Sequence, residues 1–523
     1  MNESMKKEMK NLFRKDEKRM NVQKQKKNEG ITLVALVISI IIIIILATVT
    51  INMAFGDNGL ITQAQLAKDM TANSVVSEEE SMNELLQEYA NVMAEDSNTS
   101  GTEDTAYVDT VLTAAPSVSE GMIPVKWNGN NWIKTTVEDT EWYDYANKEW
   151  ANIVLSDSTF DENGILNEEE PYSMLVWIPR YAYQITSQYH EGGEQAGNIN
   201  IVFIDTNNEN KEKSKKYSEI YPETTKENGM NNYVVHPAFN YGDEKIKGFW
   251  VGKFETSNTN CTNSKSSGEV AYTGNEIISI RANVTSWRNI NIGDAFSVCL
   301  NINSKGNNFG LTDDDDVVDP HMIKNSEWGA IVYLSKSKYG IYNEQVWNNS
   351  NDNFITGMSG TSVNASKELN TNKYNSISGQ MASTTGNITG IYDMSGGAYE
   401  FSAAYVENGN ENLYKYGQSL IDAPIRYKDV YEVSKEDEYQ TNYELATPEN
   451  GHFGDAIFET SPQGEPNVEY AWESDYADFP MGNYPFFRRG GGSWSKEPAG
   501  LFFFGRAEYS TKNGTFRVAI TVI

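Results

Sequence analysis

Residues 31–55 (ITLVALVISIIIIIILATVTINMAF) contain no charged side chain and are rich in isoleucine. A helix of about 20 apolar residues crosses a lipid bilayer, so this run is long enough to span one. A cleaved secretory signal fits less well, because its apolar region has about 7–15 residues and no A-x-A site follows here. A core helix of a globular domain would show a polar face, which this run lacks. The sequence therefore predicts a transmembrane helix over residues 31–55.

Charge is distributed unevenly around this run. Residues 1–30 contain ten Lys or Arg and five Asp or Glu, whereas the whole chain of 523 residues has a formal net charge of −31. The basic flank of a membrane helix stays in the cytoplasm. We therefore expect a basic cytoplasmic leader over residues 1–30 and a single-pass membrane protein whose C-terminal domain is extracellular. The acidity of the remaining chain argues against nucleic-acid binding, because that binding depends on Lys and Arg at the phosphates.

The junction KKNEG-ITLVALVISI at residues 26–40 is informative in itself. It resembles the cleavage segment of type IV prepilins and pseudopilins, in which a basic leader ends in Gly. The resemblance implies that a prepilin peptidase cuts between Gly30 and Ile31, and that pilin-like subunits are partners. Ala35 stands where that family usually has a Glu associated with filament assembly. An uncut signal anchor is the alternative.

Three segments follow the apolar run. Residues 56–95 carry apolar side chains mostly at three- and four-residue steps, which predicts a helical stalk. Residues 96–105 are polar and are expected to form a linker. Residues 106–170 are rich in Trp and β-forming residues. They predict either a small β-rich subdomain or an extension of the main sheet, and the sequence does not separate these two.

The rest of the chain, residues 171–523, alternates short apolar or aromatic bursts with loops rich in Gly, Asn and Ser. The bursts are typical of strands. Residues 291–300 and 326–334 are predicted helices. Few helices and many short strands indicate an α+β fold.

The order of these bursts resembles the formylglycine-generating-enzyme (sulfatase-modifying-factor) family, a large C-type-lectin-like domain. The segments that carry the resemblance are SMLVWIPRYAY (173–183), GFWVGKFETS (248–257), GIYDMSGGAYEFSAAYV (390–406), RRGGGSW (488–494) and TFRVAI (515–520). The predicted fold class is therefore α+β, with an N-terminal transmembrane pilin-like helix followed by this domain over residues 171–523. Within the matching segments, Glu400, Arg489 and Arg517 are expected to form a buried structural network of charges.

The activity of that family depends on paired cysteines near the C-terminal part of the domain. Cys261 and Cys299 are the only cysteines of this chain, so the resemblance does not carry the activity over, and we expect no enzyme. Whether these two cysteines pair is open. The four histidines show no metal-ligand spacing.

Four consecutive acidic residues offer hard oxygen ligands of the kind that Ca²⁺ prefers. They are Asp313, Asp314, Asp315 and Asp316. The run lacks the spacing of a calcium loop, and a solvated acidic loop is the alternative. We expect that no cofactor is required, with Ca²⁺ as the one candidate.

The last forty residues resemble the target proteins of diversity-generating retroelements, which bind ligands through C-type-lectin-like domains. That resemblance implies a rigid frame of RGG, AGLF and FRV that holds two exposed segments, residues 492–498 and 505–514. Ordinary loops are the alternative. The candidate contacts to a protein or glycan ligand are Trp494, Ser495, Lys496, Glu497, Phe503, Arg506, Glu508, Tyr509 and Lys512.

These observations favour a membrane-anchored, surface-displayed binding protein of the adhesin kind, on a prepilin-like anchor. A minor pilin or pseudopilin of a pilus or type II secretion-like system is the first alternative. The second alternative is an extracytoplasmic enzyme on the sulfatase-modifying-factor fold.

Overall fold

The computed structural model describes residues 114–523, apart from residues 157, 205, 207–223, 226–228, 231–232, 434–438, 465–469 and 508–511. The chain divides into two units, residues 1–106 and 107–523, and every described residue belongs to the second. The predicted leader, transmembrane helix, stalk and linker, and the junction of Gly30 and Ile31, lie outside the described residues.

The four α-helices of the described part are short. They are α4 (Ile292–Leu300), α5 (Asn325–Ser335), α6 (Glu411–Asp422) and α7 (Tyr439–Leu445). A helix needs about 20 residues to cross a bilayer, and within the described ranges none is long and apolar enough to do so. Strands hold 28% and helices 16% of the residues, so this part of the chain is mainly β. The predicted fold class, α+β with a transmembrane pilin-like helix, is therefore wrong, and the membrane and pilin assignments are not carried further.

The largest sheet has seven strands in the order β15-β23-β12-β4-β3-β1-β2, and every neighbouring pair is antiparallel. Its strands are β1 (Met122–Trp127), β2 (Trp132–Lys134), β3 (Asn152–Leu155), β4 (Met174–Pro179), β12 (Gly248–Gly252), β15 (Val318–Met322) and β23 (Val518–Val522).

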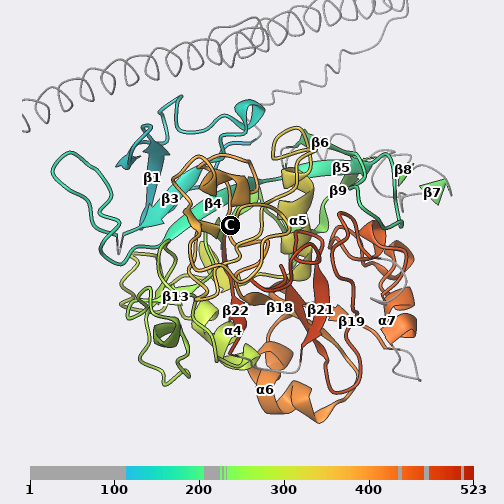
Figure 1. The fold of residues 1–523 in the computed structure, drawn as a ribbon. Helices are drawn as coiled ribbons and strands as arrows, with labels where there is room; N and C mark the ends of the chain where they lie inside the picture. Colours follow the sequence, from blue (N-terminus) through green and yellow to red (C-terminus); the bar gives the residue numbers. More distant parts are fainter. Residues whose placement is uncertain are drawn as a thin grey trace, which may run out of the picture. The chain divides into compact units, whose positions relative to one another are not determined.

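Within residues 114–170, strands β1, β2 and β3 continue this sheet beyond β4. Strands β1 and β3 can be followed beside β4 in Figure 1. Of the two alternatives, the strands of this segment thus form an extension of the main sheet. At its centre, β4 and β12 are buried along their whole length. Trp177 and Trp250 lie opposite each other there, with ring centroids 5.1 Å apart.

A second sheet carries the candidate site. It consists of β18 (Tyr399–Val406), β19 (Asp429–Tyr431), β20 (Phe486–Arg489), β21 (Phe504–Ala507) and β22 (Gly514–Phe516). Strands β20 and β21 follow β18 antiparallel, whereas β19 and β22 pair with β18 parallel. Strands β18, β19, β21 and β22 appear together in the lower half of Figure 1.

Helix α5 joins the two sheets. All its residues are buried, and it contacts β4 of the large sheet and β18 of the second sheet. At its N-terminus the Glu327 carboxylate accepts the backbone N–H of Lys324 at 2.9 Å, which satisfies one of the open donors of the first turn. The predicted helices at 291–300 and 326–334 are thus confirmed as α4 and α5.

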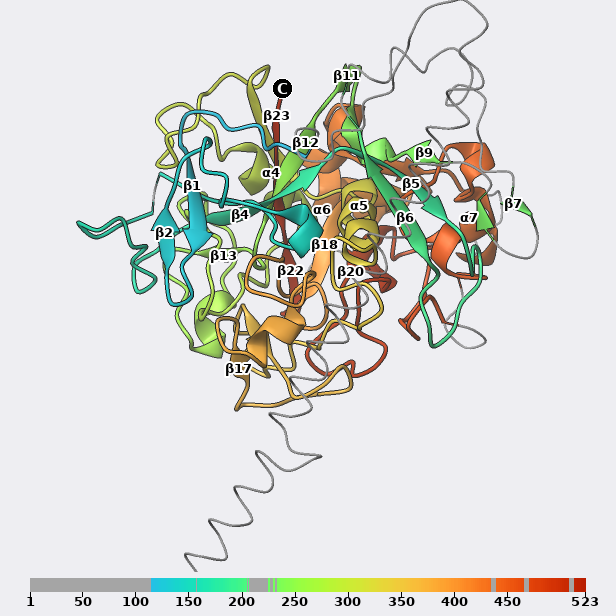
Figure 2. The same ribbon diagram turned by 90° about the horizontal axis from the view of Figure 1, so that it is seen from above.

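The remaining strands are short. A three-stranded sheet lies across the domain from β1 and β2 (Figure 2). It contains β5 (Tyr181–Ile185), β6 (Ile199–Phe203) and β9 (Val234–Val235). Four two-stranded pairs are β7 (Thr224–Thr225) with β8 (Gly229–Met230), β10 (Asn240–Tyr241) with β11 (Glu244–Lys245), β13 (Ser257–Asn258) with β14 (Ile278–Ser279), and β16 (Met358–Ser359) with β17 (Asn372–Lys373).

Candidate ligand-binding surface

Arg517, directly before β23, is fully buried and anchors the frame of the candidate surface. Its Nε donates to Glu400 Oε2 at 2.8 Å and its Nη2 donates to Glu400 Oε1, so the pair is bidentate. Its Nη1 donates to the carbonyl of Gly252 at 2.7 Å. Because Gly252 ends β12 and Glu400 lies in β18, this guanidinium ties the large sheet to the second sheet. Bidentate pairs fix geometry as well as charge.

Arg489 stands opposite Glu400 in the strand register but binds elsewhere. Its Nη atoms donate to the carbonyls of Asp455 and Ala456 at 3.2 and 3.3 Å, and its guanidinium lies 5.5 Å from the Trp328 ring. Burial lowers the pKa of Arg489 to about 10, so the side chain stays charged at neutral pH. The expected network of three residues is therefore one ion pair, Arg517 with Glu400, beside a separately held arginine.

Two further buried carboxyl groups fix the segment that leads into β18. Asp393, with a left-handed φ of 65°, accepts the Asn349 Nδ2 at 2.8 Å and the Gly357 N–H at 2.9 Å. Glu255 Oε1 accepts the N–H of Ala398 at 2.8 Å. Burial raises the pKa of Asp393 to about 6 and the pKa of Glu255 well above its usual range.

The loop after β20 is held from several sides. Gly490 and Gly491 have φ of 80° and 77°, a region that favours glycine, and a Cβ on Gly491 would lie 2.7 Å from Ala499. Ser493 donates its N–H to the Gly397 carbonyl at 2.8 Å, and Ser366 Oγ donates to the Trp494 carbonyl at 3.2 Å. The loop thus presents Trp494 from a backbone that is bonded on both sides.

The indole of Trp494 folds back onto its own loop. A Cβ on Gly492 would lie 2.7 Å from this ring, so only glycine leaves room for it. The ring meets Tyr399 edge to face at 5.1 Å and Phe354 at 5.9 Å. These contacts fix the position of a side chain that remains partly exposed.

Tyr399, the first residue of β18, is the centre of a group of stacked side chains. The Arg488 guanidinium lies 4.1 Å from its ring centroid, and Phe503 lies 5.6 Å away. Tyr476 in turn stacks on Phe503 at 5.6 Å. We call Tyr399, Tyr476, Arg488, Trp494 and Phe503 the aromatic cluster.

Arg488 has a particular role in this cluster. It is partly exposed, and in the described part of the chain no acceptor lies within hydrogen-bond reach of its guanidinium. Its plane is supported by the Tyr399 ring through a cation–π contact. The side chain is therefore positioned by stacking; its Nε is buried, and the Nη donors are the ones left for another partner.

The structure brings several of the predicted contacts together. Trp494 and Ser495 are partly exposed and Lys496 and Glu497 are exposed in the same loop, with Lys496 at a left-handed φ of 60°. Phe503 is only 2% exposed and supports the cluster from below, because it packs between Tyr399 and Tyr476.

Two of the predicted contact residues lie at the edges of the surface, and two lie outside the described residues. Arg506 on β21 pairs with Asp478 at 3.0 Å, with 36% of its side chain exposed. Lys512, with 72% of its side chain exposed, precedes β22. Glu508 and Tyr509 lie outside the described residues.

Tyr399, Tyr476 and Arg488 were not predicted. One signal was available: in a strand, neighbouring side chains point to opposite faces. Since Glu400 and Arg489 were expected to be buried, Tyr399 and Arg488 beside them had to face the other way. No comparable pattern marks Tyr476, which lies in an irregular segment before β20.

The candidate calcium site gains no support from the geometry. Asp313, Asp314, Asp315 and Asp316 are all exposed. Asp314 Oδ1 accepts the backbone N–H of Asp316 at 3.1 Å, and Asp315 Oδ1 accepts Asn303 Nδ2 at 2.8 Å. Among the described residues, no group of three or more His, Cys, Asp or Glu side chains is arranged to hold a metal ion. Asp313 to Asp316 thus form an exposed acidic turn, and the expectation of a Ca²⁺ site there stays a prediction.

The two cysteines do not form a site either. Cys261 and Cys299 are both buried free thiols, so they do not pair with each other. Burial raises the pKa of each thiol.

The chain was also compared with known proteins. No family model matches the sequence, and no curated protein matches it either.

Proposed function

We propose that the aromatic cluster is a protein-binding surface and that the domain acts as a binding protein. The observation that carries this proposal is that Trp494 and Arg488 both contact the ring of Tyr399 at a partly exposed site. Trp, Tyr and Arg are the residue types that dominate the binding energy of protein interfaces. The resemblance of residues 171–523 to C-type-lectin-like binding domains supports the same proposal.

The rigidity of the surface favours binding as well. Loops that are ordered before binding lose less conformational entropy when a partner arrives. The loop that carries Trp494 is bonded to Gly397 and Ser366, and behind it Phe502 donates its N–H to the buried Asp475 carboxylate at 2.7 Å. The surface therefore needs little rearrangement to receive a ligand.

The charges indicate which kind of protein segment fits. Among the described residues, no acceptor bonds the Nη atoms of Arg488, and a guanidinium recognises a carboxylate through paired hydrogen bonds. The indole of Trp494, which contacts the same Tyr399 ring, offers an apolar edge. We therefore expect the partner to present an Asp, a Glu or a C-terminal carboxylate next to an apolar or aromatic side chain.

A peptide library displayed on phage tests this proposal. The immobilised full-length chain should enrich peptides that combine an acidic and an apolar residue, and the Trp494→Ala and Arg488→Gln variants should not retain them. Trp127→Ala is the matched control, because Trp127 is also partly exposed but lies on β1 of the other sheet. Peptides that bind all four proteins equally, or binding to a glycan array that Trp494→Ala abolishes while no peptide is enriched, would overturn the proposal.

A further inference from the structure

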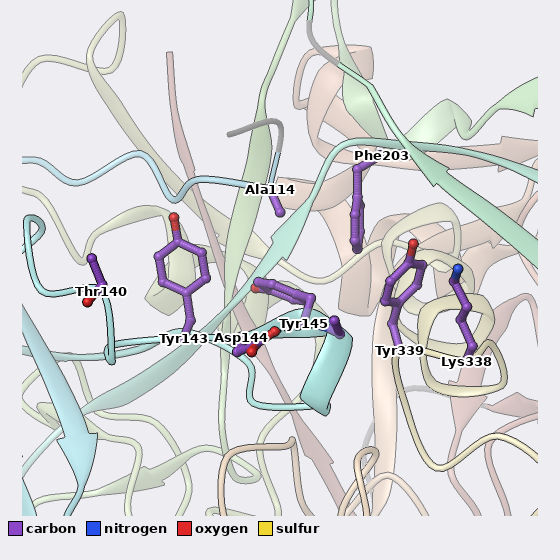
Figure 3. A pocket seen from close by; sticks show the side chains of 9 residues that line it. Ala114, Thr140, Tyr143, Asp144, Tyr145, Phe203, Lys338 and Tyr339 are labelled. Atoms are coloured by element: carbon purple, nitrogen blue, oxygen red, sulfur yellow. Dashed lines mark hydrogen bonds between the residues drawn. The ribbon is translucent and has the colours of Figure 1, made fainter. Parts of the chain in front are cut away.

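A separate cavity of about 430 Å³ lies between four parts of the domain that are distant in sequence (Figure 3). Its walls come from Ala114, from the segment 140–146, from the end of β6 and from the loop after α5. The volume falls within the range of roughly 300–1,000 Å³ that is usual for small-molecule sites. None of the residues that line it belongs to the aromatic cluster.

Aromatic rings form a continuous wall of this cavity. Tyr143 meets Tyr145 at 5.9 Å, Tyr145 meets Phe203 at 5.5 Å, and Phe203 meets Tyr339 at 4.6 Å. Tyr145 and Phe203 are buried, and Tyr145 is fixed by a hydrogen bond of 2.8 Å from its hydroxyl to the Trp177 carbonyl. The wall is therefore rigid and offers ring faces rather than flexible aliphatic chains.

Polar groups at the rim have unused hydrogen-bonding capacity. Within the described ranges, the hydroxyls of Tyr143 and Tyr339 make no hydrogen bond, and Lys338 has no carboxylate partner. The Lys338 ammonium lies 5.1 Å from the Tyr339 ring centroid and is exposed.

Asp144, the acid of this rim, is already engaged. Its carboxylate accepts the N–H of Ala146 at 3.0 Å and both the N–H and the Nδ2 of Asn147, at 3.3 and 2.7 Å. Asp144 keeps its charge, but its oxygens are occupied, so the charged group of this rim with donors free for a ligand is Lys338, in a chain whose net charge is −31.

Aromatic faces and scattered hydroxyl partners suit one ligand class in particular. The C–H groups of a pyranose ring carry a partial positive charge that the negative face of an aromatic ring attracts. The hydroxyl groups of a sugar need several separate donors and acceptors, which the two tyrosines supply. We propose that this cavity binds a sugar that carries a carboxylate, such as a hexuronic acid, with its ring against this aromatic wall and its carboxylate at Lys338.

Saturation-transfer NMR and titration of the full-length chain with glucuronate and with glucose test the proposal. Wild-type protein should bind both sugars, glucuronate about fivefold more tightly, which is near the upper end for a partly exposed ion pair. Lys338→Met should remove this preference by weakening glucuronate binding more than glucose binding. Lys305→Met, in an exposed loop after α4, is the matched control and should keep the preference.

Substitution of Tyr143, one ring of the aromatic wall, gives a second readout. Tyr143→Ala should weaken the binding of both sugars several-fold, whereas Tyr143→Phe keeps the ring and should lose less affinity. Trp494→Ala should change the affinity for neither sugar, so failure of the sugar-binding proposal is distinct from failure of the protein-binding proposal. The inference is overturned if wild-type protein binds neither sugar in the millimolar range, or if Lys338→Met still prefers glucuronate.

Discussion

The replacement Arg517→Met probes the connection between the two sheets. Methionine has a similar length without charge, so the substitution mainly removes the bidentate pair with Glu400 and the bond to Gly252. Breaking a buried pair by removing one partner costs about 3–5 kcal/mol. Domains are commonly stable by only about 5–15 kcal/mol, so we expect the variant to fold with much of its stability lost.

The loss of stability in the Arg517→Met variant should depend on pH. Without Arg517, Glu400 remains buried near Glu255 and Asp393, and the pKa values of all three carboxyls are already raised by burial. A carboxyl whose pKa is raised in the folded state favours folding below its unfolded pKa and loses that contribution as the pH rises. The difference in the free energy of unfolding between wild type and variant should therefore be larger at pH 8 than at pH 5.

Urea denaturation followed by tryptophan fluorescence measures this directly. The first of the 11 tryptophans is Trp127, so the signal reports only on the unit that contains the two sheets. Glu400→Gln and the double variant complete a double-mutant cycle. The double variant should lose less stability than the sum of the losses in the two single variants. A loss below about 1 kcal/mol, or one that is equal at both pH values, refutes the reasoning, because a buried pair costs more than an exposed one.

Three further predictions concern other parts of the domain. Gly492→Ala should displace the indole of Trp494, since the added Cβ would lie 2.7 Å from it; peptide binding should fall while the urea midpoint stays nearly constant, and unchanged binding would contradict this packing. Burial raises the pKa of Glu459 to about 7, so its contribution to the free energy of unfolding is fully present below its unfolded pKa and should fall by about 3 kcal/mol as the pH rises from 4.5 through 7. Glu459→Gln should flatten this dependence of stability on pH in urea titrations, and an unaltered dependence would assign it to other groups. Cys261 and Cys299 are buried, so the native protein should react with a thiol reagent only on unfolding, and rapid labelling of either would show that it is accessible.

Part of this architecture was predictable from local sequence. The helices α4 and α5 have apolar stretches of helical length, and Asn291 caps the first by accepting the N–H of Asp294 at 2.8 Å. Glu400 within an apolar strand and Arg517 between two apolar strands also indicated a buried pair. Such patterns depend on neighbours in the chain, which a sequence displays directly.

Other features depend on contacts between distant segments. The last strand, β23, lies between β12 and β15, and no local pattern determines that order. Phe502, Phe503 and Phe504 are consecutive and all buried, so alternation does not show which of them reaches the surface. The assignment of Phe503 to the ligand came from the resemblance to the retroelement target proteins. The membrane assignment rested on residues 31–55, their basic flank and the junction at Gly30, and none of the helices in the described part is long and apolar enough to span a membrane.

Hydrogen exchange with a selected peptide tests the central claim most directly. If the aromatic cluster binds the peptide, amide exchange should slow in the segments 396–401 and 488–504, and the strands β1 and β2 should exchange as in the free protein. The same peptide should leave exchange unchanged in the Trp494→Ala variant. Protection that maps to another face of the domain, or that persists in this variant, would contradict the account.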